Sequence, residues 1–195
     1  QMQRIIGYLP EEWVPDKYRS TALSRWVANA LKAEYQEIYQ PDLAIINNGG
    51  LRKRIPAGAV SLRDLHELAP FSNTVTVFSC WGRDLIYLDE VNAQHAVSKP
   101  HDICEVAGLG FDTRVIKSQS YEEYLPWQNR YTVNGELLIP DKVYRVVSHD
   151  YVAGQWDKYL GFKPFDVYDT GEPILDAIIR QVDKQYGLRE DEGWD

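Results

Sequence analysis

The clearest pattern along the chain is a helical spacing of apolar residues over positions 20–39. Ser20 or Thr21 can cap the first turn of this helix, and Pro41 prevents the helix from continuing. Five apolar residues recur at intervals that place them on one face: Leu23, Trp26, Val27, Ala30 and Leu31. The pattern therefore predicts an amphipathic helix.

Three further segments have helical signals. Ser61 can cap a helix that ends near Leu68, and Asp64 stands where a capping box needs its acidic partner. Residues 83–94 follow a Trp-Gly turn, and residues 172–187 end at a glycine. The last segment places four apolar residues on one face: Ile174, Ala177, Ile178 and Val182.

Strand-like runs alternate irregularly with these helices. The run at 74–80 alternates like a half-buried strand, the run at 130–139 contains the hairpin signal Asn134-Gly135, and the run at 142–149 leads into residues 149–160. Two more strands are expected at 42–47 and 104–116. Because no regular βα repeat appears, we expect an α+β fold, a single domain of mixed sheet and helices.

Length and charge limit the possible functions. The 195 residues suit one domain, with its core at about 5–187 and an acidic tail at 188–195. A net charge of −8 argues against a nucleic-acid polymer as partner. No apolar run is long enough to span a membrane. Cys80 and Cys104 have no metal-ligand spacing, so each is expected to be a buried apolar residue, and whether they pair stays open.

A sharp change of character follows the strand at 42–47. The chain reads Asn47-Asn48-Gly49-Gly50 and then turns basic at Arg52, Lys53 and Arg54. Glycines allow the backbone to approach a ligand closely, and an arginine just beyond can bind a phosphate or carboxylate. From these residues alone, a solvated surface loop is the more common explanation and a binding loop is the alternative.

Several ordered motifs resemble the C-terminal domain of the 5′-nucleotidase family. Its patterns N-G-G-G-I-R, I-P-x-G-x-I-T and P-F-G-N are matched by the segments 47–52, 55–58 and 70–73, and its strand ending in T-G by Trp81-Gly82. RIIGYLP resembles the first strand of that domain, and DTGEPILDAIIRQV fits its closing helix. The segment 142–159 is similar to the strand and loop that usually end in F-x-x-x-G-G-D-G-F, with Gln155-Trp156-Asp157-Lys158 in place of G-G-D-G.

The resemblance implies a nucleoside or nucleotide ligand and a role in substrate specificity. A base would stack between Phe71 and Tyr151, and Asp157 would accept hydrogen bonds from ribose hydroxyls. Arg52 would bind phosphate together with Lys17 or Arg19, two positions that the resemblance does not separate. The remaining expected ligand contacts come from two amides and from the glycine turn: Asn47, Asn73, Gly49 and Gly50.

Family members hydrolyse phosphate esters with a separate metallophosphatase domain that holds two metals. The sequence has no D-x-H, G-N-H-[DE] or G-H-x-H motif, and its four histidines are scattered, so no metal or other cofactor is expected in this chain. We expect a chain that is not catalytic by itself, completed by a metallophosphatase domain fused upstream or encoded separately. The alternative is a stand-alone nucleoside or nucleotide binder. The family resemblance implies a location in the periplasm or outside the cell.

Overall fold

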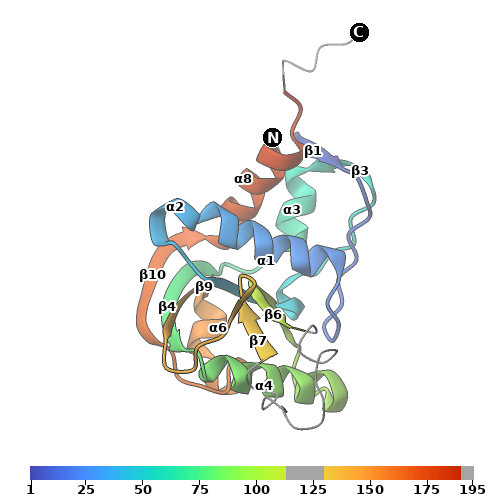
Figure 1. Cartoon of the computed structure of the whole chain (residues 1–195). Coiled ribbons are helices and arrows are strands. Elements are labelled where there is room, and N and C mark those ends of the chain that lie inside the picture. The colour runs from blue at the N-terminus through green and yellow to red at the C-terminus, as the bar shows by residue number, and fades with distance from the viewer. Residues whose placement is uncertain (113–129, 190–195) are drawn as a thin grey trace.

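The computed structural model describes residues 1–112 and 130–189. At its centre lies a five-stranded mixed sheet with the strand order β10-β4-β9-β2-β5 (Figure 1). Strands β2 and β9 are parallel, and the other neighbouring strands are antiparallel. The five strands are β2 (Leu43–Asn47), β4 (Thr74–Trp81), β5 (Cys104–Ala107), β9 (Val143–His149) and β10 (Phe165–Pro173). The expected α+β class is confirmed.

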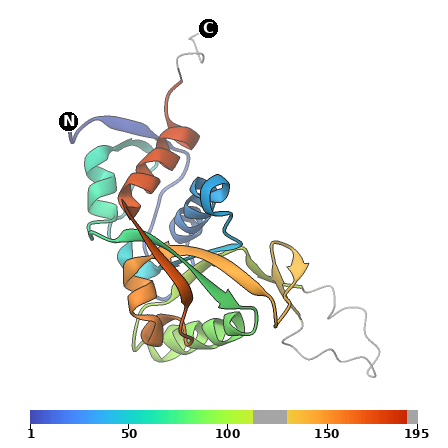
Figure 2. The ribbon, with the colours of Figure 1, turned by 90° about the vertical axis from the view of Figure 1, so that its left-hand side faces the viewer.

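Helices cover both faces of this sheet (Figure 2). On one face lie α1 (Ala22–Glu34), α3 (Leu62–Leu68) and α8 (Ile174–Tyr186), beside a ribbon of β1 (Ile5–Leu9) and β3 (Gly58–Ser61). The other face carries α4 (Asp84–Ser98), α6 (Asp150–Gly154) and α7 (Trp156–Tyr159). The short helix α2 (Gln36–Tyr39) follows α1, and a small sheet is made of β6 (Leu109–Phe111), β7 (Tyr131–Val133) and β8 (Glu136–Leu137).

Two apolar clusters fill the space between the sheet and its helices. Successive residues of β2 point to opposite faces, so Ala44 and Ile46 join the cluster under α1 and α8, whereas Leu43 and Ile45 join the cluster over α4. Because both faces of β2 are buried, its sequence is a continuous apolar run without alternation.

The helix predictions are confirmed, with small changes at their ends. Thr21 and Ser61 cap α1 and α3, and each forms a capping box with the third residue of its helix. The first helix ends before Tyr35 and a short turn, α2, continues to Tyr39. Helix α4 extends to Ser98, beyond the predicted end. Gly187 ends α8 as expected.

The strands differ more from expectation. β4 was expected to be half-buried, but six of its eight residues are buried because the sheet is covered on both faces. The strand predicted at 104–116 divides at Gly108, whose φ of +92° bends the chain between β5 and β6. The rest of that segment after Asp112, and the tail from residue 190, lie outside the described residues.

Strand β10 was not predicted. It is mostly exposed and irregular, with positive φ at Asp166 and Gly171, so it lacks the apolar alternation that identifies a strand in a sequence. The predicted hairpin is confirmed between β7 and β8, where Asn134 and Gly135 both have positive φ. Cys80 and Cys104 are both buried and free, as expected for small apolar residues.

Candidate functional site

A cleft of about 460 Å³ opens beside the end of β2. Its wall begins with Asn47, the last residue of β2, and continues through Gly49 and Gly50 of the 3-10 turn η1 (Asn48–Gly50) to Arg52. The change from apolar residues to polar, glycine and basic residues therefore has a structural reason. The buried strand ends at the edge of the cleft, and the residues that follow it form part of the cleft wall.

The three basic residues after the glycines have different roles. Lys53 forms ion pairs with Asp64 and Glu67, and Arg54 forms one with Glu12 at 2.6 Å. Arg52 instead lines the cleft, and its Nη1 donates a hydrogen bond to the carbonyl of Gly49 at 3.2 Å. Two of the three charges are thus paired with nearby carboxylates, and the third lines the cavity.

The loop before β4 adds Phe71 and Asn73 to the cleft. The Phe71 side chain is 48% exposed, which is unusual for a large aromatic residue that merely supports a core. The guanidinium of Arg52 lies 5.5 Å from the centre of the Phe71 ring. The ring is therefore held at the rim of the cleft by a cation–π contact while much of its surface stays open.

The start of α6 supplies Tyr151, which is 37% exposed and also lines the cleft. The ring of His149 runs nearly parallel to it, with 6.4 Å between centroids, and Tyr159 of α7 meets it edge-on at 5.6 Å. The Lys158 Nζ donates a hydrogen bond to the Tyr151 hydroxyl at 3.2 Å. Tyr159 and Lys158 together lower the pKa of the Tyr151 phenol.

The sequence analysis missed six residues that line the cleft: Tyr18, Pro100, His101, Asp102, Lys158 and Tyr159. Lys158 stands where the related motif has a glycine, and its Nζ lies 5.0 Å from the centre of the Tyr159 ring. Asp102 lies in the loop between α4 and β5, and its carboxylate accepts hydrogen bonds from Asn47, Gly49 and Tyr159. No spacing in the sequence identifies Asp102, because its partners are about fifty residues away on either side.

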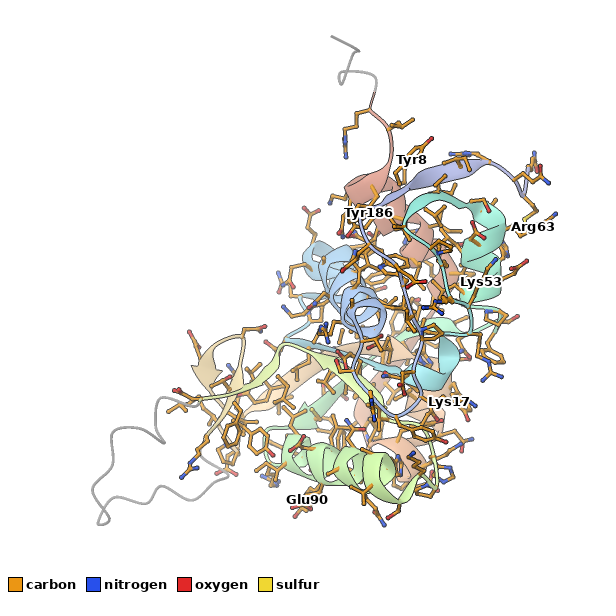
Figure 3. All side chains as sticks on the ribbon, turned by 90° about the vertical axis from the view of Figure 1, so that its right-hand side faces the viewer. Tyr8, Lys17, Lys53, Arg63, Glu90 and Tyr186 are labelled. Atoms are coloured by element: carbon orange, nitrogen blue, oxygen red, sulfur yellow. The ribbon has the colours of Figure 1, made fainter. Side chains whose placement is uncertain are left out.

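The structure separates the two cationic candidates before α1. Lys17 lines the cleft, at the end of the molecule that carries α4 and away from Tyr8 and Tyr186 (Figure 3). Arg19 does not line it, although its backbone carbonyl accepts a hydrogen bond from the Asn48 amide at 2.9 Å. Asp157 is exposed in the first turn of α7 and does not line the cleft either.

A narrow recess of about 20 Å³ adjoins the cleft and shares Asn47, Gly50, Phe71 and Asn73 with it. The buried ring of His149 lines this recess, and its Nδ1 accepts the hydrogen bond that caps α6. Burial lowers the pKa of His149 to about 4, so the imidazole is neutral at physiological pH. The recess has room for about one water molecule.

The charges around the cleft favour an anionic ligand. Lys17, Arg52 and Lys158 line it, and within the described part of the chain none of them forms an ion pair. Asp102 is the one carboxylate among the described lining residues. An anion bound here would meet a local excess of positive charge, although the whole chain is acidic.

The described residues include no group of three or more His, Cys, Asp and Glu side chains placed to hold a metal ion. His149 caps a helix, the Nδ1 of His95 contacts the backbone carbonyl of Asp102, and the ring of His95 meets that of His101 edge-on at 5.3 Å between centroids. Among the described helices, none has the length and apolar character that crossing a membrane requires.

Comparison with known proteins identifies the family. Residues 6–164 match the family model described as "5′-nucleotidase, C-terminal domain". The chain belongs to this family. It is 26% identical over 143 residues to a 5′-nucleotidase of Vibrio vulnificus, a match that covers 73% of this chain and 23% of that protein. It is 23% identical over 171 residues to the cell wall protein Lmo0130 of Listeria monocytogenes, covering 85% of this chain and 20% of that protein.

The fold of this 5′-nucleotidase C-terminal domain is similar to that of a solved 5′-nucleotidase precursor from Thermus thermophilus. The TM-score is 0.75 at 21% identity, with 96% of this chain and 39% of the solved chain covered. The chain thus spans about a fifth to two fifths of the length of these relatives. The matched range includes the glycine turn and the segments that carry Phe71 and Tyr151.

Proposed function

We propose that this C-terminal domain binds a nucleoside or nucleotide and holds the base between Phe71 and Tyr151. The observation that carries the proposal is that two partly exposed aromatic rings, one from the loop before β4 and one from the start of α6, line one cleft of suitable size. A cavity of about 460 Å³ lies within the range typical of small-molecule sites. Stacking on aromatic rings accepts any base, so this contact does not require one particular nucleoside.

The charged residues suggest how the rest of the ligand is bound. Arg52 and Lys17 are the proposed phosphate contacts, and Asn47 and Asn73 are the proposed contacts to base or sugar. Gly49 and Gly50 form part of the adjoining wall. Contacts from Arg19 and Asp157 stay predictions, because neither residue lines the cleft in this structure.

We further propose that the domain provides specificity and not the chemical step. The hydrolysis of a phosphate ester by two metals requires a set of closely placed ligands, which the family carries in a metallophosphatase domain, fused upstream or encoded separately. The binding energy gathered in this cleft would then position the scissile ester for that domain. A location in the periplasm or outside the cell fits this proposal, and the name of the Listeria relative places that protein at the cell wall.

Calorimetric titration of the chain with AMP and with adenosine, without metal, tests the proposal. Phosphate release is assayed on the same samples after Mn²⁺ is added. Binding without phosphate release is the expected result. Failure of both ligands to bind at millimolar concentration would refute the binding role, and phosphate release by the purified chain would refute the separation of binding from catalysis. A stand-alone binder would keep the same affinity when a metallophosphatase domain is supplied in trans and would yield no phosphate.

A further inference from the structure

The carboxylate of Asp102 connects three separate segments that form the cleft. Its Oδ2 accepts hydrogen bonds from Asn47 Nδ2 at 3.0 Å and from the backbone N–H of Gly49 at 2.8 Å. Its Oδ1 accepts a hydrogen bond from the Tyr159 hydroxyl at 2.6 Å. Asn47 ends a central strand and Tyr159 belongs to α7, so this one side chain ties the glycine turn to the helical side of the cleft.

The donors that Asp102 collects are those that would otherwise bind an anion from a ligand. A backbone N–H in a glycine turn, an amide N–H and a phenol O–H are all typical partners of phosphate or carboxylate oxygens. Here the protein supplies that anion itself. A phosphate at the same place would have to displace Asp102, and like charges would oppose the two of them lying side by side.

The glycine at position 49 fits this arrangement. A Cβ at this position would lie 2.7 Å from Asp102 Oδ2, closer than real Cβ contacts allow. The absence of a side chain therefore serves the approach of Asp102, whereas the sequence suggested the approach of a ligand. The same contact fixes the Asn47 amide, whose Nδ2 faces Asp102 and whose enclosed Oδ1 has no hydrogen-bond partner among the described residues.

We propose that Asp102 is a positioning residue that occupies the anion-binding donors of the glycine turn and locks this turn to Tyr159. The phosphate of a ligand is thereby left to the cations of the cleft, Lys17, Arg52 and Lys158. The part of this inference that concerns ligand affinity rests on the proposed nucleotide binding. The part that concerns the occupied donors can be tested without any nucleotide.

The test is chemical rescue of Asp102→Ala by formate. Removal of the carboxylate leaves three donors around an empty space of carboxylate size, so formate should bind there. We expect 50 mM sodium formate to raise the thermal unfolding midpoint of the variant above its value in 50 mM sodium chloride, and to leave that of the wild-type chain unchanged. Asp157→Ala is the matched control, because it removes an exposed carboxylate from the neighbouring helix. It should show no formate effect.

Adenosine titration gives the second readout. Asp102→Ala should bind adenosine at least tenfold more weakly in chloride, since unpaired donors and a freed turn are costly, and formate should restore most of the loss. A variant that is equally stable in formate and chloride, or one that keeps the wild-type affinity, would overturn the inference. If Asp102→Ala does not fold, Tyr159→Phe removes one donor only and should weaken adenosine binding about threefold; unchanged affinity would then contradict it.

Failure of this inference can be separated from failure of the proposed function. If the wild-type chain binds neither adenosine nor AMP while formate still stabilises Asp102→Ala, the nucleotide proposal is refuted and the assignment of Asp102 stands. If the wild-type chain binds nucleotides and formate has no effect on either readout, the proposal for Asp102 is refuted and the nucleotide site stands.

Discussion

Truncation of Phe71 to alanine should remove one of the two surfaces on which the base stacks. Stacking of a base on an aromatic side chain contributes about 1–3 kcal/mol, which corresponds to a loss of adenosine affinity of about 5- to 150-fold. The structure indicates that the fold itself will lose little, because the Phe71 ring is 48% exposed and belongs to a loop. Its cation–π contact with Arg52, at 5.5 Å, contributes about 0.5–1 kcal/mol at such an exposed site.

The assay is calorimetric titration with adenosine, paired with a thermal unfolding measurement on the same preparation. Tyr8→Ala is a matched control, since Tyr8 is 47% exposed but lies on β1, at the opposite end of the molecule from Lys17 (Figure 3). The control should bind adenosine as the wild-type chain does. A folded Phe71→Ala variant with unchanged adenosine affinity would show that this ring is not a stacking surface.

Three further changes test other parts of the account. In calorimetry, Arg52→Ala should weaken the binding of AMP about tenfold more than the binding of adenosine. The control Arg54→Ala, whose partner is Glu12, should affect the two affinities equally. An equal loss of both affinities in Arg52→Ala would show that Arg52 does not contact phosphate. The pKa of His149 is lowered to about 4 from an ordinary 6.5, so on acidification the unfolded chain binds a proton at this residue before the folded chain does. The free energy of unfolding should therefore keep its full value above pH 6.5 and fall by up to about 3 kcal/mol towards pH 4. His149→Asn keeps a capping residue and should flatten this part of the pH profile in urea unfolding; an unchanged profile would contradict the assignment. Gly82→Ala should lower the free energy of unfolding by about 2 kcal/mol in the same assay, because the added Cβ would lie 2.1 Å from the backbone carbonyl oxygen of Ile139. A variant as stable as the wild-type chain would contradict this prediction and show that the turn relaxes.

Local patterns in the sequence predicted much of the fold for identifiable reasons. The capped helices were predictable because a cap, its partner and an apolar face all lie within a few residues of one another, as in α3 with Ser61 and Asp64. Strand β10 was not predictable, because it is held by backbone pairing to β4 and not by an apolar face of its own. The burial of both faces of β4 also depends on what packs against it, which the strand's own residues do not specify.

The candidate site also contains residues that local motifs predicted and residues that only the tertiary structure reveals. Phe71, Arg52 and Tyr151 were predicted because they stand in recognisable motifs, and the structure brings them to one cleft. Asp102 was missed because its partners Asn47 and Tyr159 are 55 and 57 residues away, and only the fold brings them together. The sequence showed Lys53 and Arg54 as part of the same basic run as Arg52 but did not show their carboxylate partners, which are 11 to 42 residues distant.

The same distinction explains why the glycine turn was only partly understood. The sequence correctly indicated that a close approach takes place at Gly49, since no side chain is present there. What approaches is a carboxylate of the protein, which a linear reading has no means to identify. A glycine motif thus predicts that some group packs closely against the backbone, and the tertiary structure determines which group this is.

The most direct test of the central claim is a crystal structure of the chain grown with AMP. The account predicts density for the base between the rings of Phe71 and Tyr151, with the phosphate near Arg52 and Lys17 and the Asp102 carboxylate still bonded to the N–H of Gly49. A base bound elsewhere on the chain, with both rings left open to solvent at saturating AMP, would contradict the account.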